Sequence, residues 1–524
     1  MVYKINRLFT KIRYIYDSKW WLYIKYRNIK INEKQFLFES YSAVNFQGNV
    51  YYLFKYFFNN QKYALYKFII VAESPEKIKK YLINRGLLDD RVSIVKYKSK
   101  NYIRKIYSSK YLFNNVTFPM DFVKKNEQIY INTWHGTPLK CLGKSVANDP
   151  FIIQNIERDF LTCQYLISPN MHTTNILEND YMICKIMPGK ILEVGYPRNE
   201  IFYDYVYRNK VRSELGFENK KVILYMPTWR GAANGNKRDI DYDEIMGNLL
   251  SRLGNDYIFY FKLHPLDADI NTNNFNFRII PDNYEIYEFL NACDILITDY
   301  SSVLFDYANA LKKILLFQFD KKEYFKERGI YKGIDQIIDF PICRTVDDLY
   351  NHIINEKDCN VSKNFLKEFC YYDMKNPTHE ICKQIFSKNV NDFRADLKLI
   401  VIIEKITDEQ ILMLKNRYEK NELHFAFVPT KSNVFFKNLS CWKDIDYLII
   451  DKKGKYLIKE RILQIIYNFI KTKKIGIYIN NVKIREQKRM FGELKINEVL
   501  YWKKVNNLPD YLICDEIKRN VINL

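Results

Sequence analysis

Glycine and proline are scarce in this sequence, at 16 and 14 of 524 residues, which leaves little room for disordered linkers. No internal repeat or low-complexity segment interrupts the chain. No run approaches the ~18 apolar residues of a transmembrane helix, and the amino terminus lacks the apolar core of a signal peptide. We therefore expect a globular protein, soluble or bound at a membrane surface, with roughly three domains of ordinary size.

The ten cysteines are spread along the chain without a CxxC pair or a Cys/His cluster. This spacing argues against a zinc site and a disulfide framework, and it predicts a reducing cytoplasm. Positive charge, in contrast, is abundant, because 82 Lys and Arg oppose 61 Asp and Glu for a net charge of +21. Such a balance calls for nucleic acid, anionic lipid or a phosphorylated substrate. No RNA- or DNA-binding motif accompanies the charge, so we expect no nucleic acid partner.

The amino-terminal segment, residues 1–34, is basic and aromatic. Residues 1–30 hold eight basic and eight aromatic residues against a single acid, Asp17. A helix of this composition can lie in a membrane interface, with its rings at head-group depth and its Lys and Arg against anionic lipid. A helix packed on the first domain explains the pattern equally well.

From residue 35 onward, strand-like apolar runs alternate with helical patterns, which predicts parallel sheets with crossover helices. We expect two α/β domains, at 35–205 and 206–390, and a third α/β segment at 391–524 that carries no chemical motif. The expected strands are 35–39, 66–71, 92–95, 127–133, 165–168, 222–225, 257–261, 295–297, 314–317, 397–403, 424–428, 447–450 and 475–479. In the third segment, 409–420 and 458–472 are the expected helices.

The segment from Asp294 to Tyr307 is the most informative part of the sequence. Its apolar first half ends at Thr298-Asp299 and reads as a buried parallel strand, and its second half opens with Ser301-Ser302 and continues with helical spacing. A serine-capped helix directly after a strand presents free N–H groups at the carboxyl edge of the sheet, where open α/β sheets hold phosphates. Ser302 and Asp306 are four residues apart and face the same way. An ordinary helix cap explains the same residues.

A histidine follows the strand expected at 127–133. His135 stands between Trp134 and Gly136, and Thr137 and Pro138 come next. A histidine at the end of a strand can be exposed in a cleft, where its near-neutral pKa suits it to take a proton from an attacking hydroxyl. Gly136 allows backbone to approach a ligand closely. A purely structural histidine is the alternative.

Two strands of the second domain end in polar groups in the same manner. Pro227 turns the chain outward so that Thr228 can offer a hydroxyl, and Lys262 and His264 project to one side of the extended chain as donors to an anion. The alternatives are a strand-ending turn and a core histidine. Asp267-Ala268-Asp269 has the spacing of a metal-binding pair, but a surface turn explains it better because no strand delivers the carboxylates into a cleft.

The join between the two domains falls near Tyr196-Pro197-Arg198-Asn199. A guanidinium at this position could span the cleft to a diphosphate.

Taken together, these motifs resemble the CDP-glycerol glycerophosphotransferase family, the teichoic acid polymerases and primases of Gram-positive and related bacterial envelopes. The resemblance covers roughly residues 35–390 and implies a GT-B architecture, in which two Rossmann-like domains face a cleft, with no metal or other cofactor. The motifs that carry it, in the family's order, are Trp134-His135-Gly136-Thr137-Pro138-Leu139-Lys140, Gly195-Tyr196-Pro197-Arg198-Asn199, Met226-Pro227-Thr228-Trp229-Arg230, Lys262-Leu263-His264-Pro265 and Thr298-Asp299-Tyr300-Ser301-Ser302 through Asp306.

The resemblance also implies a role for each residue. His135 would be the general base that deprotonates the acceptor hydroxyl, and His264 with Lys262 would hold the diphosphate of the donor and steady the departing CMP. The remaining substrate-binding residues that it implies are Trp134, Gly136, Thr137, Pro138, Arg198, Pro227, Thr228, Leu263, Ser301, Ser302 and Asp306.

The implied reaction moves a polyol phosphate from CDP-glycerol or CDP-ribitol to a hydroxyl of a lipid-linked or glycan acceptor and releases CMP. The protein would work as a peripheral protein on the anionic inner face of the cell membrane, and a homo-oligomer is compatible with the sequence. A GT-B glycosyltransferase that uses a nucleotide sugar for surface polysaccharide is the nearest alternative, and a nucleic-acid-binding protein is a remote one.

Overall fold

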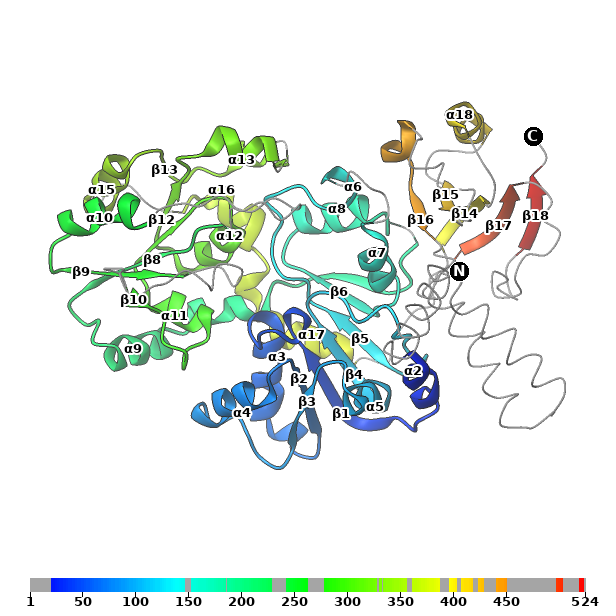
Figure 1. The fold of residues 1–524 in the computed structure, drawn as a ribbon, viewed down its shortest axis with the longest axis horizontal. Helices are drawn as coiled ribbons and strands as arrows, with labels where there is room; N and C mark the ends of the chain where they lie inside the picture. Colours follow the sequence, from blue (N-terminus) through cyan, green and yellow to red (C-terminus); the bar gives the residue numbers. More distant parts are fainter. Residues whose placement is uncertain are drawn as a thin grey trace, which may run out of the picture.

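The structure is a computed structural model, and it describes residues 20–146, 152–184, 186–228, 242–262, 278–327, 329–331, 333–355, 361–386, 395–402, 407–417, 423–427, 440–449, 496–502 and 518–522. Three parallel β-sheets with flanking helices follow one another along the chain (Figure 1). The first domain lies in the middle, with the second domain on one side and the C-terminal segment on the other. The two facing α/β domains confirm the predicted fold class.

The first domain is built on a seven-stranded parallel sheet of order β3-β2-β1-β4-β5-β6-β7. Its strands are β1 (Asn32–Glu39), β2 (Lys67–Ala72), β3 (Val92–Lys96), β4 (Ser109–Asn114), β5 (Ile129–Asn132), β6 (Tyr165–Ser168) and β7 (Lys190–Glu193). Its helices are α2 (Trp20–Tyr26), η1 (Tyr41–Ala43), α3 (Gly48–Asn59), η2 (Gln61–Tyr63), α4 (Pro75–Asn84), α5 (Lys100–Ser108), α6 (Gly143–Val146), α7 (Gln154–Phe160), α8 (Met171–Asp180) and η3 (Pro197–Tyr203).

The second domain repeats the plan with a six-stranded parallel sheet of order β10-β9-β8-β11-β12-β13. Its strands are β8 (Lys221–Tyr225), β9 (Tyr257–Phe261), β10 (Arg278–Ile279), β11 (Ile295–Thr298), β12 (Lys313–Phe317) and β13 (Ile342–Cys343). Its helices are α9 (Tyr205–Glu214), α10 (Tyr242–Arg252), α11 (Ile286–Ala292), α12 (Val303–Tyr307), η6 (Ala308–Ala310), α13 (Lys321–Glu327), α14 (Ile334–Ile337), α15 (Val346–Ile354), α16 (Lys363–Phe365), the π-helix η7 (Leu366–Cys370), η8 (Asp373–Lys375) and α17 (Pro377–Ile385).

The C-terminal segment contains a third parallel sheet, of order β16-β15-β14-β17-β18. Its described elements are β14 (Ala395–Ile402), α18 (Asp408–Arg417), β15 (Leu423–Phe427), η10 (Ser440–Asp444), β16 (Tyr447–Ile449), β17 (Ile496–Trp502) and β18 (Lys518–Ile522). The strand expected at 475–479 and the helix expected at 458–472 lie outside the described residues.

The chain crosses between the two large domains twice. It first passes from β7 through η3 into the second domain, and it returns when α17, the last helix of the expected 206–390 domain, packs on α3 of the first domain. The ring of Phe386 then lies 5.5 Å from that of Tyr63 and 5.2 Å from that of Tyr111, between centroids. The end of the second domain in sequence therefore belongs in space to the core of the first.

Helix α2 covers the first domain beside α5. Leu22 and Tyr23 are buried, and the rings of Tyr23 and Tyr107 meet at 6.3 Å. This part of the amino-terminal segment packs as a structural helix, while residues 1–19 lie outside the described residues, so the membrane-surface helix stays a prediction. Within the described residues, no helix has both the length and the apolar character needed to cross a bilayer.

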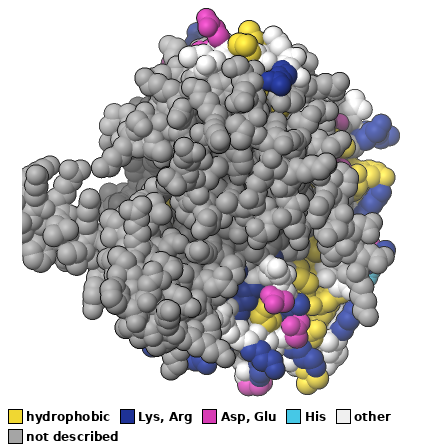
Figure 2. All heavy atoms as spheres, turned by 90° about the vertical axis from the view of Figure 1, so that its right-hand side faces the viewer, with side chains coloured by type: hydrophobic (Ala, Val, Ile, Leu, Met, Phe, Trp, Pro, Cys, Tyr) yellow, Lys and Arg dark blue, Asp and Glu magenta, His cyan; other side chains and the backbone are white. Residues whose placement is uncertain are grey.

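The C-terminal segment docks on the first domain through a shared apolar core. Phe425 and Tyr447 belong to the same buried cluster as Met182 and Phe160. Lys144 on α6 forms an ion pair with Asp446 at 3.1 Å. Viewed from the side of this segment, the described surface mixes Lys and Arg with acidic and hydrophobic side chains (Figure 2).

Candidate active site

A cavity of about 660 Å³ lies between the first two domains, at the carboxyl ends of their central strands. Parallel sheets bind ligands at this edge, because the strand ends and the following helix starts leave backbone and polar side chains free there. The described lining residues are Tyr41, Val44, Asn45, Gln47, Trp134, His135, Gly136, Thr137, Pro138, Leu139, Lys140, Leu142, Met226, Pro227, Thr228, Lys262, Ile286, Tyr287, Tyr300, Ser301, Ser302 and Val303. The cavity thus collects ten of the fourteen predicted site residues.

His135 lines this cavity, on the turn that follows β5. The turn is fixed because Trp134, at a left-handed φ of 49°, donates its N–H to the Asn132 side chain at 2.9 Å. The Nδ1 atom of His135 lies 3.2 Å from the carbonyl oxygen of Asn115. A carbonyl only accepts, so Nδ1 carries the proton and Nε2 keeps a free lone pair. Burial lowers the pKa of His135 to about 4. The hydrogen bond to Asn115 opposes this shift, and the nearby positive charge of Arg198 adds to it.

Gly136 is the point where the two domains touch inside the cavity. A Cβ atom on Gly136 would lie 2.8 Å from Oγ of Ser302, which precedes α12 of the second domain. Real Cβ atoms do not approach a heavy atom so closely, so a larger residue here would displace the Ser302 side chain. The histidine motif of one domain and the serine motif of the other are therefore in direct contact.

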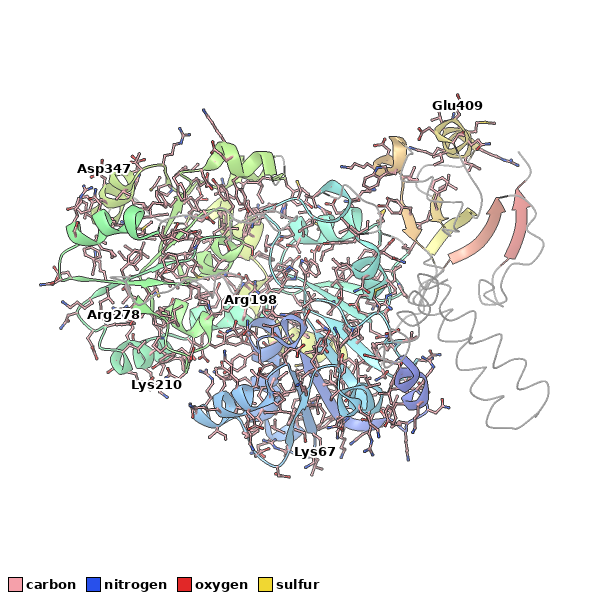
Figure 3. All side chains as sticks on the ribbon, in the orientation of Figure 1. Lys67, Arg198, Lys210, Arg278, Asp347 and Glu409 are labelled. Atoms are coloured by element: carbon pink, nitrogen blue, oxygen red, sulfur yellow. The ribbon has the colours of Figure 1, made fainter. Side chains whose placement is uncertain are left out.

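Arg198 and Asp306 bind each other rather than lining the cavity. The Arg198 Nη2 atom lies 2.9 and 2.8 Å from the two carboxylate oxygens of Asp306, and both residues are buried. Arg198 also donates through Nη1 to the carbonyl oxygen of His135 at 3.0 Å. Figure 3 shows Arg198 at the boundary between the two domains. In this arrangement the pair positions the His135 turn against α12, and a contact of either residue with substrate stays a prediction.

The ends of β8 and β11 are joined by Asp299. Its carboxylate accepts the N–H of Thr228 at 3.0 Å and the Thr228 hydroxyl at 2.6 Å. Thr298 ties the same turn by donating its hydroxyl to the Met226 carbonyl at 2.8 Å. Pro227 and Thr228 are thereby held at the cavity wall, as are Ser301 and Ser302 of the neighbouring turn.

Lys262 lies where β9 reaches the cavity, and it forms no ion pair with any residue in the described parts of the chain. Burial lowers its pKa, although the carboxylates of Glu285 and Asp282 oppose that shift. Leu263 and His264, together with Trp229 and Arg230, lie outside the described residues. Their predicted roles stay predictions.

The strap formed by residues 138–142 closes one side of the cavity. Lys140 forms a β-bridge with Ile330, and Cys141 donates its N–H to the Gly329 carbonyl at 2.9 Å. The Leu142 N–H reaches the hydroxyl of Tyr331 at 2.8 Å. Thr137 is buried and accepts a hydrogen bond from Asn170 at 3.2 Å, so its hydroxyl already has a donor.

The loop after β1 is a part of the wall that the sequence analysis missed. Tyr41, Ser42 and Ala43 all adopt left-handed φ angles, between 46° and 67°, which is strained for residues with a Cβ atom. The loop is held because Gly48 and Tyr52 donate to the Glu285 carboxylate at 3.0 and 3.1 Å.

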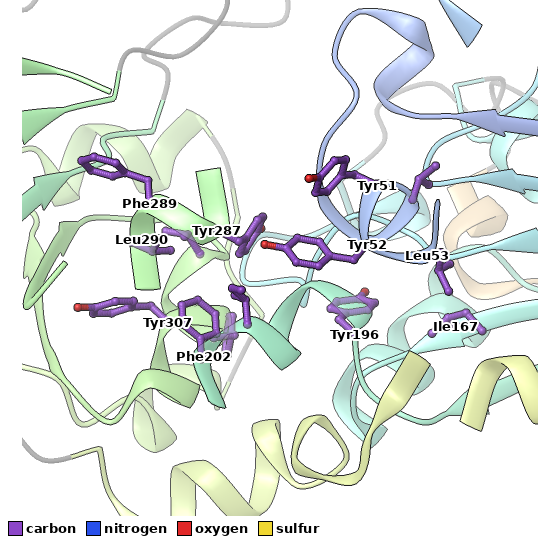
Figure 4. Close-up of a cluster of buried hydrophobic side chains, with 14 of the residues drawn as sticks. Tyr51, Tyr52, Leu53, Ile167, Tyr196, Phe202, Tyr287, Phe289, Leu290 and Tyr307 are labelled. Carbon is purple, nitrogen blue, oxygen red and sulfur yellow. The ribbon is translucent and has the colours of Figure 1, made fainter. Parts of the chain in front are cut away.

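Figure 4 shows Tyr52 of the first domain facing Tyr287 of the second. Tyr287 in turn donates to Asp306 at 3.2 Å. The sequence offered one signal for this loop, its position directly after a strand, and the same kind of position led to the prediction of His135. The left-handed backbone could not be foreseen from Tyr-Ser-Ala.

Two parallel Rossmann-like domains whose strand ends face a shared cavity define a transferase fold of the GT-B type. Within that class, the model of the CDP-Glycerol:Poly(glycerophosphate) glycerophosphotransferase family matches residues 22–387, and the chain belongs to this family. The predicted resemblance is thereby confirmed.

Relatives agree with this assignment. The chain is 30% identical over 378 residues to a teichoic acid poly(glycerol phosphate) polymerase of Bacillus spizizenii, covering 68% of this chain and 92% of that protein. It is 31% identical over 351 residues to the polymerase of the same name from Staphylococcus epidermidis, covering 64% of this chain and 46% of that protein. The chain spans about half the length of that relative and of the Bacillus subtilis polymerase, of which it covers 52%.

A solved structure is also similar. The wall teichoic acid polymerase TagF, in a variant soaked with CDPG, superposes with a TM-score of 0.60 and 28% identity, over 74% of this chain and 97% of that chain.

Proposed function

We propose that this protein transfers a polyol phosphate, glycerol phosphate in the first instance, from a CDP-polyol to a hydroxyl of a lipid-linked or glycan acceptor. The product is a cell-envelope polymer of the teichoic acid or capsule type. In the reaction, the acceptor oxygen bonds to the β-phosphorus of the donor, the bond from that phosphorus to the bridging oxygen breaks, and CMP leaves.

One observation carries the proposal. The turn with His135 and the turn with Ser301 and Ser302 meet at the Gly136 contact, inside one cavity of about 660 Å³. A base from one domain can therefore act on the acceptor while polar groups from the other contact the bound donor. Positioning of this kind supplies much of the rate enhancement of phosphoryl-type transfer.

His135 acts as the general base. Its Nε2 atom is free because Nδ1 is bound to Asn115, and its lowered pKa keeps the ring neutral at physiological pH. The acceptor hydroxyl passes its proton to Nε2 as its oxygen attacks phosphorus. Arg198 holds this turn through the His135 carbonyl, so the ring does not need to reorganise during the reaction.

Lys262 offsets the charge of the donor diphosphate, since it reaches the cavity without a carboxylate bound among the described residues. The hydroxyls of Ser301 and Ser302 line the same wall and donate to phosphate oxygens. Thr228 adds a third hydroxyl whose position Asp299 sets. His264 joins Lys262 in steadying the departing CMP.

CMP release is the deciding measurement. Purified protein with CDP-glycerol or CDP-ribitol and a lipid-linked acceptor is expected to release CMP, and His135→Ala should reduce the rate to background. Sugar nucleotides serve as the control donors, and a thermal-shift series of the same compounds reports which nucleotide binds most tightly. The proposal fails if neither CDP-polyol gives CMP above the His135→Ala level.

A lipid-linked acceptor and the +21 charge support a reaction at the inner face of the cell membrane. Cosedimentation with vesicles that contain anionic lipid tests this part of the proposal. Deletion of residues 1–19 should release the protein if this segment is the membrane-surface anchor, and unchanged binding would assign attachment to another surface.

A further inference from the structure

Three neighbouring strands of the first domain, β1, β4 and β5, end beside the cavity. Their pairing places Asn114, the last residue of β4, opposite Glu39 of β1 on one side and Asn132 of β5 on the other. The loop after β1 brings Tyr41 to the cavity wall, and the turn after β5 brings His135. The residues that follow β4 therefore lie between these two parts of the wall.

Asn115, the first residue after β4, contacts both of its neighbours. Its backbone carbonyl oxygen lies 3.2 Å from Nδ1 of His135, and its side-chain Oδ1 accepts the N–H of Tyr41 at 2.8 Å. A backbone N–H only donates, so this contact also fixes which end of the amide is the oxygen. The side chain is buried, and its Nδ2 atom bonds to no residue in the described parts of the chain. Within those parts, the Asn115 amide serves the Tyr41 contact alone.

The peptide unit between Asn115 and Val116 is held at its other end as well. Its N–H group, which belongs to Val116, donates to Oδ1 of the buried Asn114 at 2.7 Å. The N–H and the carbonyl of one peptide unit lie in a plane, so an acceptor for the N–H also sets the direction of the carbonyl. Two asparagine side chains thus aim the Asn115 carbonyl at the His135 ring.

A second contact holds the backbone of His135. Arg198 donates from Nη1 to the His135 carbonyl at 3.0 Å. The Tyr41 hydroxyl adjoins the same guanidinium, because a Cβ atom on Gly48 would lie 3.4 Å from Tyr41 Oη and 3.8 Å from Arg198 Nη1. Burial raises the pKa of Tyr41, and the charge and hydrogen bond of Arg198 oppose that shift. Asn115, Tyr41, Arg198 and His135 therefore form a closed series of contacts.

We propose that Asn114 and Asn115 are positioning residues, which keep the His135 proton on Nδ1 and leave Nε2 available to the acceptor hydroxyl. This inference rests on the proposed function, in which Nε2 takes the proton of that hydroxyl. The hydrogen bond made by one ring nitrogen decides which nitrogen carries the proton. A ring with its proton on Nε2 would present a donor where the reaction needs an acceptor, so the base would be lost although the ring remained in place.

The test replaces each amide by an alkyl group of similar shape, in Asn114→Leu and Asn115→Leu. The ¹⁵N resonances of histidine-labelled protein report which ring nitrogen carries the proton, and the spectrum of His135→Gln identifies the His135 signals among the six histidines. At pH 7 the wild type should carry the proton on Nδ1. Each leucine variant should show the Nε2–H form, and its kcat for CMP release should fall about tenfold to a hundredfold at an unchanged donor KM.

Two further variants separate this role from a loss of stability. Gln128 is also buried, and its Oε1 accepts the backbone N–H of Lys125 at 3.0 Å, but it lies at the end of β5 opposite to His135. Gln128→Leu should lower the melting temperature and leave the His135 proton on Nδ1. Asn115→Asp keeps an acceptor for the Tyr41 N–H and should keep the Nδ1–H form as well.

Several results would overturn the inference. One is a wild-type ring with its proton on Nε2, and another is a proton that stays on Nδ1 in both leucine variants. An equal displacement in Gln128→Leu would assign the effect to general loss of packing, and one in Asn115→Asp would show that the Tyr41 contact does not hold the ring. The proton position is measured without substrate, so a wild type that releases no CMP would contradict the proposed function and leave this result intact.

Discussion

At the scale of single residues, the site depends on two close contacts. Gly136 lies against Ser302, and Arg198 joins the His135 carbonyl to the Asp306 carboxylate. Both contacts connect the first domain to the second at the point where the reaction is proposed. Changes at these positions should therefore act on catalysis through geometry as well as through lost chemistry.

Gly136→Ala tests the first contact. The added Cβ would lie 2.8 Å from Ser302 Oγ, so the Ser302 side chain must rotate away from its place in the cavity or the two turns must separate. Displacements of about 1 Å can cost about a hundredfold in rate, and we expect CMP release to fall by about tenfold to a hundredfold. Gly247→Ala on α10, where nothing lies within 4 Å, is the control and should retain full activity. A Gly136→Ala protein with the wild-type rate would show that the contact is dispensable.

The pH profile tests the state of His135. Because its pKa is lowered to about 4, the ring stays neutral and can accept a proton down to about pH 5. Protonation below that pKa removes the base, so kcat/KM should fall on the acid side with an apparent pKa near 4, well below the usual value of about 6.5. Initial rates measured between pH 3 and 8, with a check that activity returns at neutral pH, give the curve. A midpoint near 6.5 would contradict the lowered pKa of His135.

A double-mutant cycle tests the Arg198–Asp306 pair. Removing one partner leaves a buried charge uncompensated, so Arg198→Met and Asp306→Asn should each lower the free energy of unfolding by about 3 kcal/mol. The double variant should recover part of that loss, because neither charge remains. Urea unfolding measures all four proteins. Additive losses would indicate that the two groups act independently.

At the scale of helices and strands, the sequence predicts those elements whose signals are local. The strands at 165–168 and 257–261 match β6 and β9 in full, because each is an apolar run bounded by polar residues. β4 was missed because Ser109 both ends α5 and begins the strand, so no turn separates them. β10 and β13 are two residues long and have no periodicity to detect. The ten predicted residues that line the cavity follow strand ends, whereas the loop that begins with Tyr41–Ala43 depends on backbone angles that its residue types disfavour.

The strap of residues 138–142 has its own test, Tyr331→Phe. The lost hydroxyl accepts the Leu142 N–H at 2.8 Å and donates to Asp180 at 2.6 Å. An amide without its acceptor costs about 1–3 kcal/mol, so the strap should open more often. Hydrogen exchange at Cys141 and Leu142 should become faster. Tyr350 on α15 is the control, because its hydroxyl bonds to no described residue, and Tyr350→Phe should leave that exchange unchanged. Slow exchange in both variants would contradict the role given to Tyr331.

At the scale of the whole molecule, the C-terminal segment is fastened to the first domain at a buried pair of titratable groups. His424 Nε2 lies 3.8 Å from Glu157 Oε1, and both side chains are buried. Burial lowers the pKa of His424 to about 4 and raises the pKa of Glu157 well above its usual value, with Asp446 and Lys144 as charged neighbours. Both groups are therefore neutral at the interface.

Glu157→Gln tests this interface. Above pH ~4.5 the unfolded chain loses the Glu157 proton while the folded protein keeps it, so this group makes folding less favourable as pH rises. Glutamine removes that dependence, and the variant should become progressively more stable than the wild type between pH 5 and 8. At pH 4 the Glu157 side chain is largely neutral in the folded and in the unfolded protein. The wild type and the variant should therefore have similar stability at that pH. A difference that does not change with pH would show that Glu157 is ionised in the folded state.

The double crossing between the large domains restricts how they can move. Asp373, where the chain returns, accepts the N–H of Tyr196 at 2.7 Å and the amide of Asn199 at 2.8 Å, where the chain first crosses. The two connections are thus bound to each other at one place. A pair of linked connections permits a hinge rotation of the domains about that place. It opposes translation and twisting of one domain against the other. Such a restriction would keep His135 and Ser302 in the same alignment, as the proposed transfer between the two domains requires.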